Sequence, residues 1–473
     1  MKKILSLSVL MSTLLLAGCM SMAPDYKRPS MPVADQWRSN SATATTQTNA
    51  AKPLSETSWQ SFFLDERLRK VIALALEHNR DLRVSVLNIE KARAEYRVQR
   101  SESLPSVSVG GTQTASRTSA ATSTTGVSSV GRQYSAEIGF SSYELDLFGR
   151  IRSLNDQALE SFFATEETKR SAQLSLIAEV AGDWLTLATN QQLLTLASNT
   201  LASQQKTLAL SEARHKVGAI SGMDLAQIRT SVESARLDVA QQKAQIEQDR
   251  NALELVVGTA VPDALLPTGS SNSAVTLAQI PASLSSRILL DRPDVLSAEH
   301  TLKAANAEIG AARAAFFPTI SLTASGGFSS DQLSSLFTGA NRTWSFVPTV
   351  SIPIFNAGNL KASLKVSETE RDIAVADYEK SIQTAFSEVA DALAVRASMK
   401  EQLDAQKALV QASQTAYRLA DARYRNGIDG YLDALDAQRT LYSAQQTQLS
   451  LYLTDLKNRV TLYKVLGGGI NAS

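Results

Sequence analysis

The sequence predicts an α+β membrane protein in which long helices and four amphipathic strands are arranged as a tandem repeat. Three observations predict this fold class. The twelve prolines leave two large parts of the chain free of strong helix breakers. Short segments with a two-residue apolar period lie between the helical parts. The same motifs recur in both halves of the 473-residue chain.

The longest helices are expected where glycine and proline are absent or rare. Residues 359–426 contain neither, and as one helix they would extend about 100 Å at 1.5 Å per residue. Residues 151–217 are interrupted only by Gly182. Each stretch ends at a short glycine-containing break, residues 217–222 and 426–430, and a further helical run follows. The pattern predicts two helical hairpins, and the narrow apolar stripe favours coiled-coil-like packing.

Four segments alternate apolar and polar residues, which is typical of strands with one apolar face. We expect strands at residues 106–117, 133–147, 319–330 and 342–354. The alternation changes parity near Tyr143, which predicts a β-bulge or the exit from the sheet. Residues rich in Ser, Thr, Gly and Asn connect the paired strands and predict exposed, mobile loops.

The two halves share residues at constant offsets. Five residues that precede the first strand pair recur 213 positions later, directly before the second pair. They are Ala92, Ala94, Glu95, Arg100 and Pro105, which match Ala305, Ala307, Glu308, Arg313 and Pro318. Motifs after the strands recur at an offset of 209, so the chain is expected to be a tandem duplication of helix, strand, loop, strand and helical hairpin.

The composition argues against several functional classes. The 47 basic and 46 acidic residues nearly balance, which argues against nucleic acid binding. A single cysteine excludes an internal disulfide framework and a Cys-built zinc site. The histidines, His78, His215 and His300, are scattered without a second ligand at helical spacing. We therefore expect no metal, no cofactor, no catalytic residues and no enzymatic activity.

The first nineteen residues predict export. Lys2 and Lys3 precede an apolar run, residues 4–17, that is too short to span a bilayer comfortably and is typical of a signal peptide. Cys19 follows two small residues, and this arrangement resembles the lipobox of bacterial lipoproteins. The resemblance implies cleavage before Cys19, a diacylglyceryl group on its sulfur and an acyl chain such as palmitate on the new amino terminus. Because Met20 rather than aspartate follows, it also implies delivery to the outer membrane. The alternative is a buried or stray thiol.

The domain organisation follows from these patterns. We expect a signal peptide (1–18), a lipid-anchored N-terminal segment (19–55), a first repeat (56–262), a linker (263–292) and a second repeat with a C-terminal tail (293–473).

Four strands cannot close a transmembrane barrel within one chain, because such barrels need about eight strands or more to leave no unpaired edge. The chain is therefore expected to oligomerise. A dimer would give eight strands around a lumen filled by side chains, whereas a trimer would give twelve strands with room for a pore. The duplicated hairpins would form a pseudo-sixfold periplasmic tube beneath this barrel.

The duplicated pattern resembles the TolC-type outer-membrane channels, and the local motifs are similar to the OprM-like (NodT-type) lipoproteins of resistance-nodulation-division (RND) efflux pumps. These motifs span essentially the whole mature chain. They are PDYKRP (24–29), WQSFF (59–63), NRDL (79–82), YELDLFGR (143–150), DRPDV (291–295) and FFP (316–318). A departure is FNAG (355–358), where many relatives have two glycines.

The resemblance implies a homotrimeric outer-membrane exit duct of a tripartite multidrug efflux pump, passive in itself and relevant to antibiotic resistance. Its implied partners are outer-membrane lipid, a periplasmic adaptor (membrane fusion) protein and an inner-membrane RND transporter. One alternative is a duct of the same fold for type I protein secretion, against which the lipobox and the DRPDV motif count. Another is a coiled-coil lipoprotein without a pore, which would not need four amphipathic strands.

The resemblance also implies functional residues at the turn after the second long helix. Tyr424, Gly427, Asp433 and Asp436 match the family's periplasmic tip, where paired carboxylates face the closed channel. Asp433 and Asp436 are three residues apart and so lie on one helix face. In a trimer they would form two rings of carboxylates that favour cations. The alternative is that both simply occupy the first turn of a helix, where carboxylates favour the dipole.

The two hairpins are not equivalent in this respect. The first repeat has Asp224 but Gln227 at the positions that correspond to the acidic pair. Gly218 and Gly427 are expected to adopt left-handed turn conformations. Together with Tyr424 and Arg423 they form a candidate contact surface for the adaptor.

Overall fold

The computed structural model describes residues 21–37, 57–268 and 285–469. The expected signal peptide and Cys19 lie outside the described residues, as do most of the expected 19–55 segment, the middle of the 263–292 linker and the last residues of the tail. The described chain forms two compact units. One comprises residues up to 30, 88–166 and 297–379, and the other comprises 31–87, 167–296 and 380–473.

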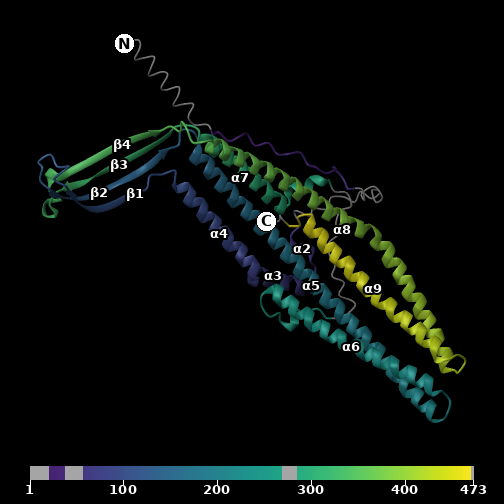
Figure 1. Cartoon of the computed structure of the whole chain (residues 1–473). Coiled ribbons are helices and arrows are strands. Elements are labelled where there is room, and N and C mark those ends of the chain that lie inside the picture. The colour runs from purple at the N-terminus through teal and green to yellow at the C-terminus, as the bar shows by residue number, and fades with distance from the viewer. Residues whose placement is uncertain (1–20, 38–56, 269–284, 470–473) are drawn as a thin grey trace. The chain divides into compact units, whose positions relative to one another are not determined.

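The elements follow one another as helices, a strand pair and a long helical hairpin, and then do so again (Figure 1). The first set is α2 (Trp59–Phe62), α3 (Glu66–His78), α4 (Arg80–Ser101), β1 (Val107–Thr118), β2 (Ser129–Leu145), α5 (Arg150–Lys216) and α6 (Gly222–Val257). The second set is α7 (Pro293–Ala314), β3 (Thr319–Ser330), β4 (Arg342–Ser351), α8 (Asn359–Arg425) and α9 (Tyr431–Val465). Short 3-10 turns occur at Asp263–Leu265, Ser286–Asp291, Leu333–Ser335 and Gly339–Asn341. Among the described helices, none is both long and apolar enough to cross a bilayer.

Equivalent helices have matching bounds in the two halves. The first and last residues of α4 and α7 differ by 213 (80 to 293, and 101 to 314), which is the offset of the sequence motifs before the strands. Those of α5 and α8 differ by 209 (150 to 359, and 216 to 425), and both helices have 67 residues. The duplication therefore includes whole helices as well as single motifs. Helix α5 is continuous through Gly182.

The strands form one antiparallel sheet in the order β1-β2-β3-β4. The second strand begins at Ser129, earlier than expected, because its ladder with β1 continues to the pair Thr118↔Ser129. The fourth ends at Ser351, before Pro353, which has no N–H group to donate to a ladder. The register shifts between Phe140 and Tyr143 and pairing then resumes, so the change of parity marks a β-bulge or similar irregularity within the sheet and not the exit from it.

The register assigns one face of the sheet to apolar side chains and the other to small polar ones. Val109, Ile138 and Gly326 are connected by pairing across three strands, and so are Phe140, Ala324 and Phe346. The intervening positions on β3 are Thr319, Ser321, Thr323, Ser325, Gly327 and Ser329. The apolar face is exposed at Val109, Ile138 and Phe346, whose exposed fractions are 77%, 56% and 57%.

The loop between β3 and β4 is more ordered internally than the sequence predicted. Asn341 donates hydrogen bonds to the carbonyl oxygen of Ser335 at 2.7 Å and to the hydroxyl of Thr338 at 3.0 Å. Leu336 is buried, and Phe337 packs edge-on against Phe328. These hydrogen bonds and the buried side chain of Leu336 thus give the loop internal contacts of its own.

The core of the second unit includes contacts between short segments and the long helices. Phe62 stacks on Tyr463, and Phe63 meets both rings edge-on. Trp184 of α5 is fully buried and donates its indole hydrogen bond to the carbonyl oxygen of Leu265 at 3.1 Å. These contacts fix α2 and the segment after α6 to the long helices.

Candidate functional site

The two hairpin turns have the same backbone conformation. Gly218 and Gly427 have φ angles of +74° and +71°, a left-handed conformation that favours glycine. In both turns the glycine N–H bonds to the carbonyl oxygen three residues earlier, at 2.9 Å, and the next N–H bonds to the carbonyl five residues before it. The turn conformation predicted from the two glycines is confirmed.

The helices that follow these turns begin differently. Ser221 caps α6, and its hydroxyl accepts a hydrogen bond from the Asp224 N–H at 3.0 Å while the Asp224 carboxylate accepts one from the Ser221 N–H at 3.3 Å. This is a capping box. Helix α9 instead begins after Gly430, which has no side chain to cap it. Asp224 therefore belongs to a capping box, whereas Asp433, its equivalent in the first turn of α9, has no serine partner at the cap.

A cluster of five buried residues holds the turns together, and we call it the tip cluster. Its members are Ile228, Tyr424, Tyr431, Ala434 and Leu435. The rings of Tyr424 and Tyr431 meet edge-on with centroids 5.2 Å apart. Burial raises the pKa of Tyr431 to about 12, so its hydroxyl stays protonated at neutral pH. That hydroxyl donates to Gln204 Oε1 at 3.2 Å, and Gln204 Nε2 donates to Gln438 Oε1 at 2.7 Å.

Polar contacts connect the α5–α6 hairpin to the α8–α9 hairpin around Tyr424. The hydroxyl groups of Ser211 and Tyr424 lie 3.1 Å apart in the interior. Arg214 donates to the carbonyl oxygen of Arg425 at 2.7 Å, and its guanidinium group lies 5.6 Å from the centre of the Tyr424 ring. Tyr424 is thus buried between the hairpins, which favours a role in joining them over a direct contact with an adaptor.

Sequence reasoning did not identify Ser211, Arg214 or Gln204 as part of this site. Arg214 had one signal, because it is the equivalent of Arg423 at the repeat offset of 209. Ser211 and Gln204 had none, since their partners lie more than 200 residues away in the chain.

The acidic pair lies on the solvent side of α9. Asp433 and Asp436 are both exposed, whereas Ala434 and Leu435 between them face the tip cluster. This confirms that the two carboxylates share a helix face directed away from the core of the hairpins. Within the described part of the chain, neither carboxylate has an ion-pair partner.

The neighbouring arginines form ion pairs with carboxylates other than those of Asp433 and Asp436. Arg423 forms an ion pair with Asp429 across the turn, and Arg425 pairs with Asp421 at 2.9 Å one helical turn earlier. The hydrogen bond to Asp429 raises the pKa of Arg423, with Asp433 adding a smaller electrostatic effect. Both arginines are therefore paired with carboxylates other than those of the acidic pair.

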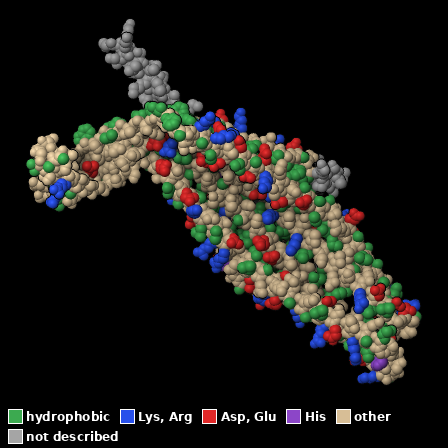
Figure 2. Space-filling view, in the orientation of Figure 1, with side chains coloured by type: hydrophobic (Ala, Val, Ile, Leu, Met, Phe, Trp, Pro, Cys, Tyr) green, Lys and Arg blue, Asp and Glu red, His purple; other side chains and the backbone are tan. Residues whose placement is uncertain are grey.

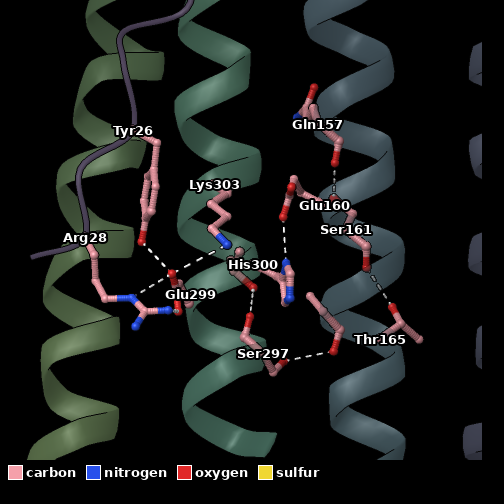
Figure 3. Close-up of polar contacts among 12 residues, drawn as sticks. Tyr26, Arg28, Gln157, Glu160, Ser161, Thr165, Ser297, Glu299, His300 and Lys303 are labelled. Carbon is pink, nitrogen blue, oxygen red and sulfur yellow. Dashed lines mark hydrogen bonds and ion pairs between the residues drawn. The ribbon is translucent and has the colours of Figure 1, made fainter. Parts of the chain in front are cut away.

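A second arrangement of polar groups lies along α7, where the PDYKRP motif is bound (Figure 3). The Glu299 carboxylate, only 3% exposed, accepts hydrogen bonds from the Tyr26 hydroxyl at 3.0 Å and from two nitrogens of Arg28 at 3.0 and 2.7 Å. Lys303 lies 3.5 Å from it. Burial alone would raise the pKa of Glu299, but the hydrogen bonds from Arg28 and Tyr26 and the charge of Lys303 hold it below its usual value.

Further bonds extend this attachment towards the N-terminus. Asn306 donates to the carbonyl oxygen of Pro24 at 2.7 Å, and Arg313 donates to that of Met22 at 3.3 Å. On the other side of α7, His300 contacts Glu160 of α5 at 2.6 Å (Figure 3). The chain just beyond Cys19 is thereby held along α7. No cluster of three or more candidate metal ligands occurs within the described residues.

Comparison with known proteins identifies the family. The family model described as "Outer membrane efflux protein" matches residues 71–259 and 284–468, which correspond to the two repeats. The chain belongs to the outer membrane efflux protein family.

Individual proteins are similar to this chain over nearly their whole length. The antibiotic efflux pump outer membrane protein ArpC of Pseudomonas putida is 48% identical over 468 residues, covering 99% of this chain and 96% of ArpC. A crystal structure of a membrane protein from Pseudomonas aeruginosa superimposes with a TM-score of 0.90 and 39% identity, covering 96% and 99% of the two chains. The open state of the Neisseria gonorrhoeae MtrE outer membrane channel superimposes with a TM-score of 0.86 and 37% identity, also covering 96% of this chain and 99% of MtrE.

Proposed function

We propose that three copies of this outer membrane efflux protein form the exit duct of a tripartite RND-type multidrug pump. The observation that carries the proposal is the open four-stranded sheet with one apolar and one polar face. Within the described chain, β1 and β4 each have one neighbouring strand, so both outer edges present unpaired N–H and C=O groups. A bilayer does not tolerate such edges, and pairing β4 of one copy with β1 of the next removes them.

An assembly of three copies explains an open channel better than an assembly of two. Twelve strands enclose a lumen wide enough for solute, whereas eight strands enclose one that side chains fill. The small polar residues of the inner face, mainly serine, threonine and glycine, suit a water-filled lumen. The apolar face would then contact lipid, and each protomer would contribute the two helical hairpins to a periplasmic tube.

The tip of this tube is the proposed gate. Three copies of Asp433 and Asp436 form two rings of carboxylates that attract cations at the constriction. The exposed turn residues Gly218, Gly427 and Arg423 form the proposed contact surface for the periplasmic adaptor, which connects the duct to the inner-membrane transporter. The name of ArpC, an antibiotic efflux pump protein, supports drugs as the substrates.

We also propose that Cys19 is the acylated N-terminus of the mature chain and that it anchors the protein in the outer membrane. The bonds that hold residues 22–28 along α7 support this, because they fix the chain close to the point of attachment. Mass spectrometry of the mature protein is expected to show acylated Cys19 as the first residue. An unmodified internal cysteine would contradict the proposal. A Cys19→Ala variant with a working secretion signal should retain some channel assembly, because the barrel itself holds the protein in the membrane.

The decisive experiment measures assembly and conductance of paired variants on β4. Phe346→Arg places a charge on the apolar face, and Ser345→Arg places the same charge one residue away on the polar face. An arginine that faces lipid near the bilayer midplane costs about 2–4 kcal/mol, so only Phe346→Arg should abolish cross-linked trimers and single-channel conductance in planar bilayers. Equal behaviour of the two variants, or a conducting monomer or dimer, would refute the trimeric barrel.

A further inference from the structure

The charged residues of the strands are distributed unequally between the two faces of the sheet. Pairing places Arg117 on the same face as Val109, Arg132 on that of Ile138 and Arg342 on that of Phe346. These are all the basic residues of the four strands, and they share the apolar face. The two acidic residues, Glu137 and Glu144, pair with Gly327 and Ser321 on the polar face.

The three arginines also lie at one end of the strands. Arg117 is the last residue but one of β1, Arg132 is near the start of β2, and Arg342 is the first residue of β4. This is the end that carries the connecting loops, away from the helices, and Figure 2 shows basic side chains gathered there. The rest of the apolar face has no charged residue among the strand positions.

Aromatic residues mark the depth at which these arginines lie. Tyr134 follows Arg132 by two residues, and Trp344 follows Arg342 by two. Residues two apart in a strand point to the same face, so each aromatic ring shares a face with its arginine. In both cases the arginine lies nearer the loops. Trp344 is 82% exposed. Tyrosine and tryptophan that face lipid favour the level of the headgroups, so the arginines would lie at or just beyond that level.

The arginines are available for a ligand. All three are exposed, and within the described part of the chain no ion pair or hydrogen bond of their guanidinium groups is found. Arg117 pairs with Val130, and Arg132 with Ala115, so the two arginines are diagonal neighbours with Cα atoms about 7–8 Å apart. Two unpaired like charges at this spacing favour an anion that both can contact.

We propose that Arg117, Arg132 and Arg342 bind the phosphate groups of lipopolysaccharide, the phosphorylated glycolipid of the outer leaflet. The guanidinium group can donate paired hydrogen bonds to phosphate oxygens. It also stacks on aromatic rings and is more weakly hydrated than an ammonium group, which suits the membrane–water interface. The loops lie at the outer end of the strands if the helices are periplasmic, which places the arginines in the outer leaflet. The inference therefore rests on the orientation and lipid-facing surface of the proposed function.

The test compares three versions of the purified channel. The first is the wild type, and the second is R117Q/R132Q/R342Q. The third moves each arginine by one residue to the polar face, as R117Q/T118R, R132Q/Q133R and R342Q/T343R combined, so that the number of arginines and their height are preserved. Binding of lipopolysaccharide, of the same glycolipid stripped of its lipid A phosphates, and of phosphatidylglycerol is measured by native mass spectrometry.

The wild type is expected to bind the phosphorylated glycolipid roughly tenfold more tightly than the stripped form, and both variants should lose this preference. Equal binding of the two glycolipids by the wild type would overturn the proposal, as would an unchanged preference in the variant with the displaced arginines. Equal competition by phosphatidylglycerol would refute the assignment to glycolipid. Conductance is recorded on the same preparations, so a failure of the channel itself is distinguished from a failure of lipid binding.

Discussion

The hydroxyl of Tyr424 lies 3.1 Å from the hydroxyl of Ser211, and this buried pair joins the two helical hairpins of one protomer. Tyr424 lies on α8 and Ser211 lies on α5, and these two helices are equivalent in the repeat. Around them, Arg214 contacts both the Tyr424 ring and the carbonyl oxygen of Arg425. Separation of the hairpins requires all of these contacts to break, so they favour the arrangement seen in this structure.

Removal of either hydroxyl should make the proposed gate open more readily. Tyr424→Phe leaves Ser211 without its buried partner, and Ser211→Ala leaves the Tyr424 hydroxyl unpaired. Each change should cost about 1–2 kcal/mol, whereas the double variant should cost less than the sum because no polar group is left unpaired. Single-channel recordings are expected to show a higher open probability in both single variants. Tyr452→Phe, at an exposed position on α9, serves as the control and should leave gating unchanged.

The sequence predicted the long helices well because their extent depends on local properties. Glycine and proline mark where helices end, and the turn conformations at Gly218 and Gly427 follow from backbone sterics alone. The two faces of the sheet were also predictable, since a two-residue period needs no knowledge of the partner strand. The ends of the strands were predicted less accurately. The start of β2 at Ser129, for example, depends on how far its partner strand β1 continues.

Contacts between distant segments were beyond sequence reasoning. The sequence placed Arg423 at the tip turn but did not indicate its ion pair with Asp429, six residues away across a turn rather than at helical spacing. Ser211 and Gln204 are unremarkable in a helix rich in polar residues, and only the packing of two hairpins shows their partners. The PDYKRP motif indicated a family but not its contacts with Glu299 on α7.

Arg292 of the DRPDV motif is expected to be important for stability. It is 8% exposed and donates to the Asp294 and Glu388 carboxylates at 2.6 and 2.8 Å and to the carbonyl oxygen of Val465, the last residue of α9, at 2.9 Å. Arg292→Gln should lower the free energy of unfolding by about 2–3 kcal/mol, because it removes a buried cation and leaves a helix end unpaired.

The stability of Arg292→Gln is measured by thermal unfolding of the purified protein. Arg292→Lys should have an intermediate effect, since an ammonium group cannot form the same forked set of bonds. Arg287→Gln, at an exposed position in the preceding turn, should change stability by less than about 0.5 kcal/mol. Equal effects of the changes at positions 287 and 292 would refute the role of the buried guanidinium group.

Attachment of the N-terminal segment to α7 should depend on pH through Glu299. Its pKa is lowered in the folded protein, so the bonds to Tyr26 and Arg28 stabilise the attachment at neutral pH. That contribution should be lost as the pH falls below the usual glutamate value of 4.5 and through the lowered folded-state pKa. The protection of residues 21–30 against hydrogen exchange, corrected for the intrinsic rate at each pH, is therefore expected to fall on acidification below about pH 4.5.

Two variants separate this effect from general acid unfolding. In Glu299→Gln these residues should be less protected at neutral pH and lose little further protection on acidification in this range, because the titrating group is gone. Asp25→Asn, at an exposed neighbouring position, should behave as the wild type. An acid response that persists unchanged in Glu299→Gln would show that another group controls the attachment.

The acidic pair on α9 should control the passage of cations. Asp433 and Asp436 are exposed, lack ion-pair partners within the described chain and follow an uncapped helix start at Gly430. In the proposed trimer, Asp433→Asn/Asp436→Asn would remove six carboxylates from the constriction while keeping side-chain shape. The trimer should remain intact because neither side chain belongs to the tip cluster. Cation selectivity and block by divalent cations should fall, most strongly at low salt, where the Debye length is about 30 Å at 0.01 M.

A matched variant distinguishes this filter from an ordinary helix start. Glu247→Gln/Glu401→Gln removes the same number of exposed carboxylates about 25 residues from the turns, or roughly 37 Å along a helix. If the acidic pair is a filter, only the variant at the tip should lose selectivity in planar bilayers at 0.01 M salt. If Asp433 and Asp436 serve the helix dipole alone, their replacement should cost about 0.3–1 kcal/mol of stability and leave conduction unchanged. Unchanged selectivity and divalent block in the tip variant would thus assign both aspartates to the start of α9.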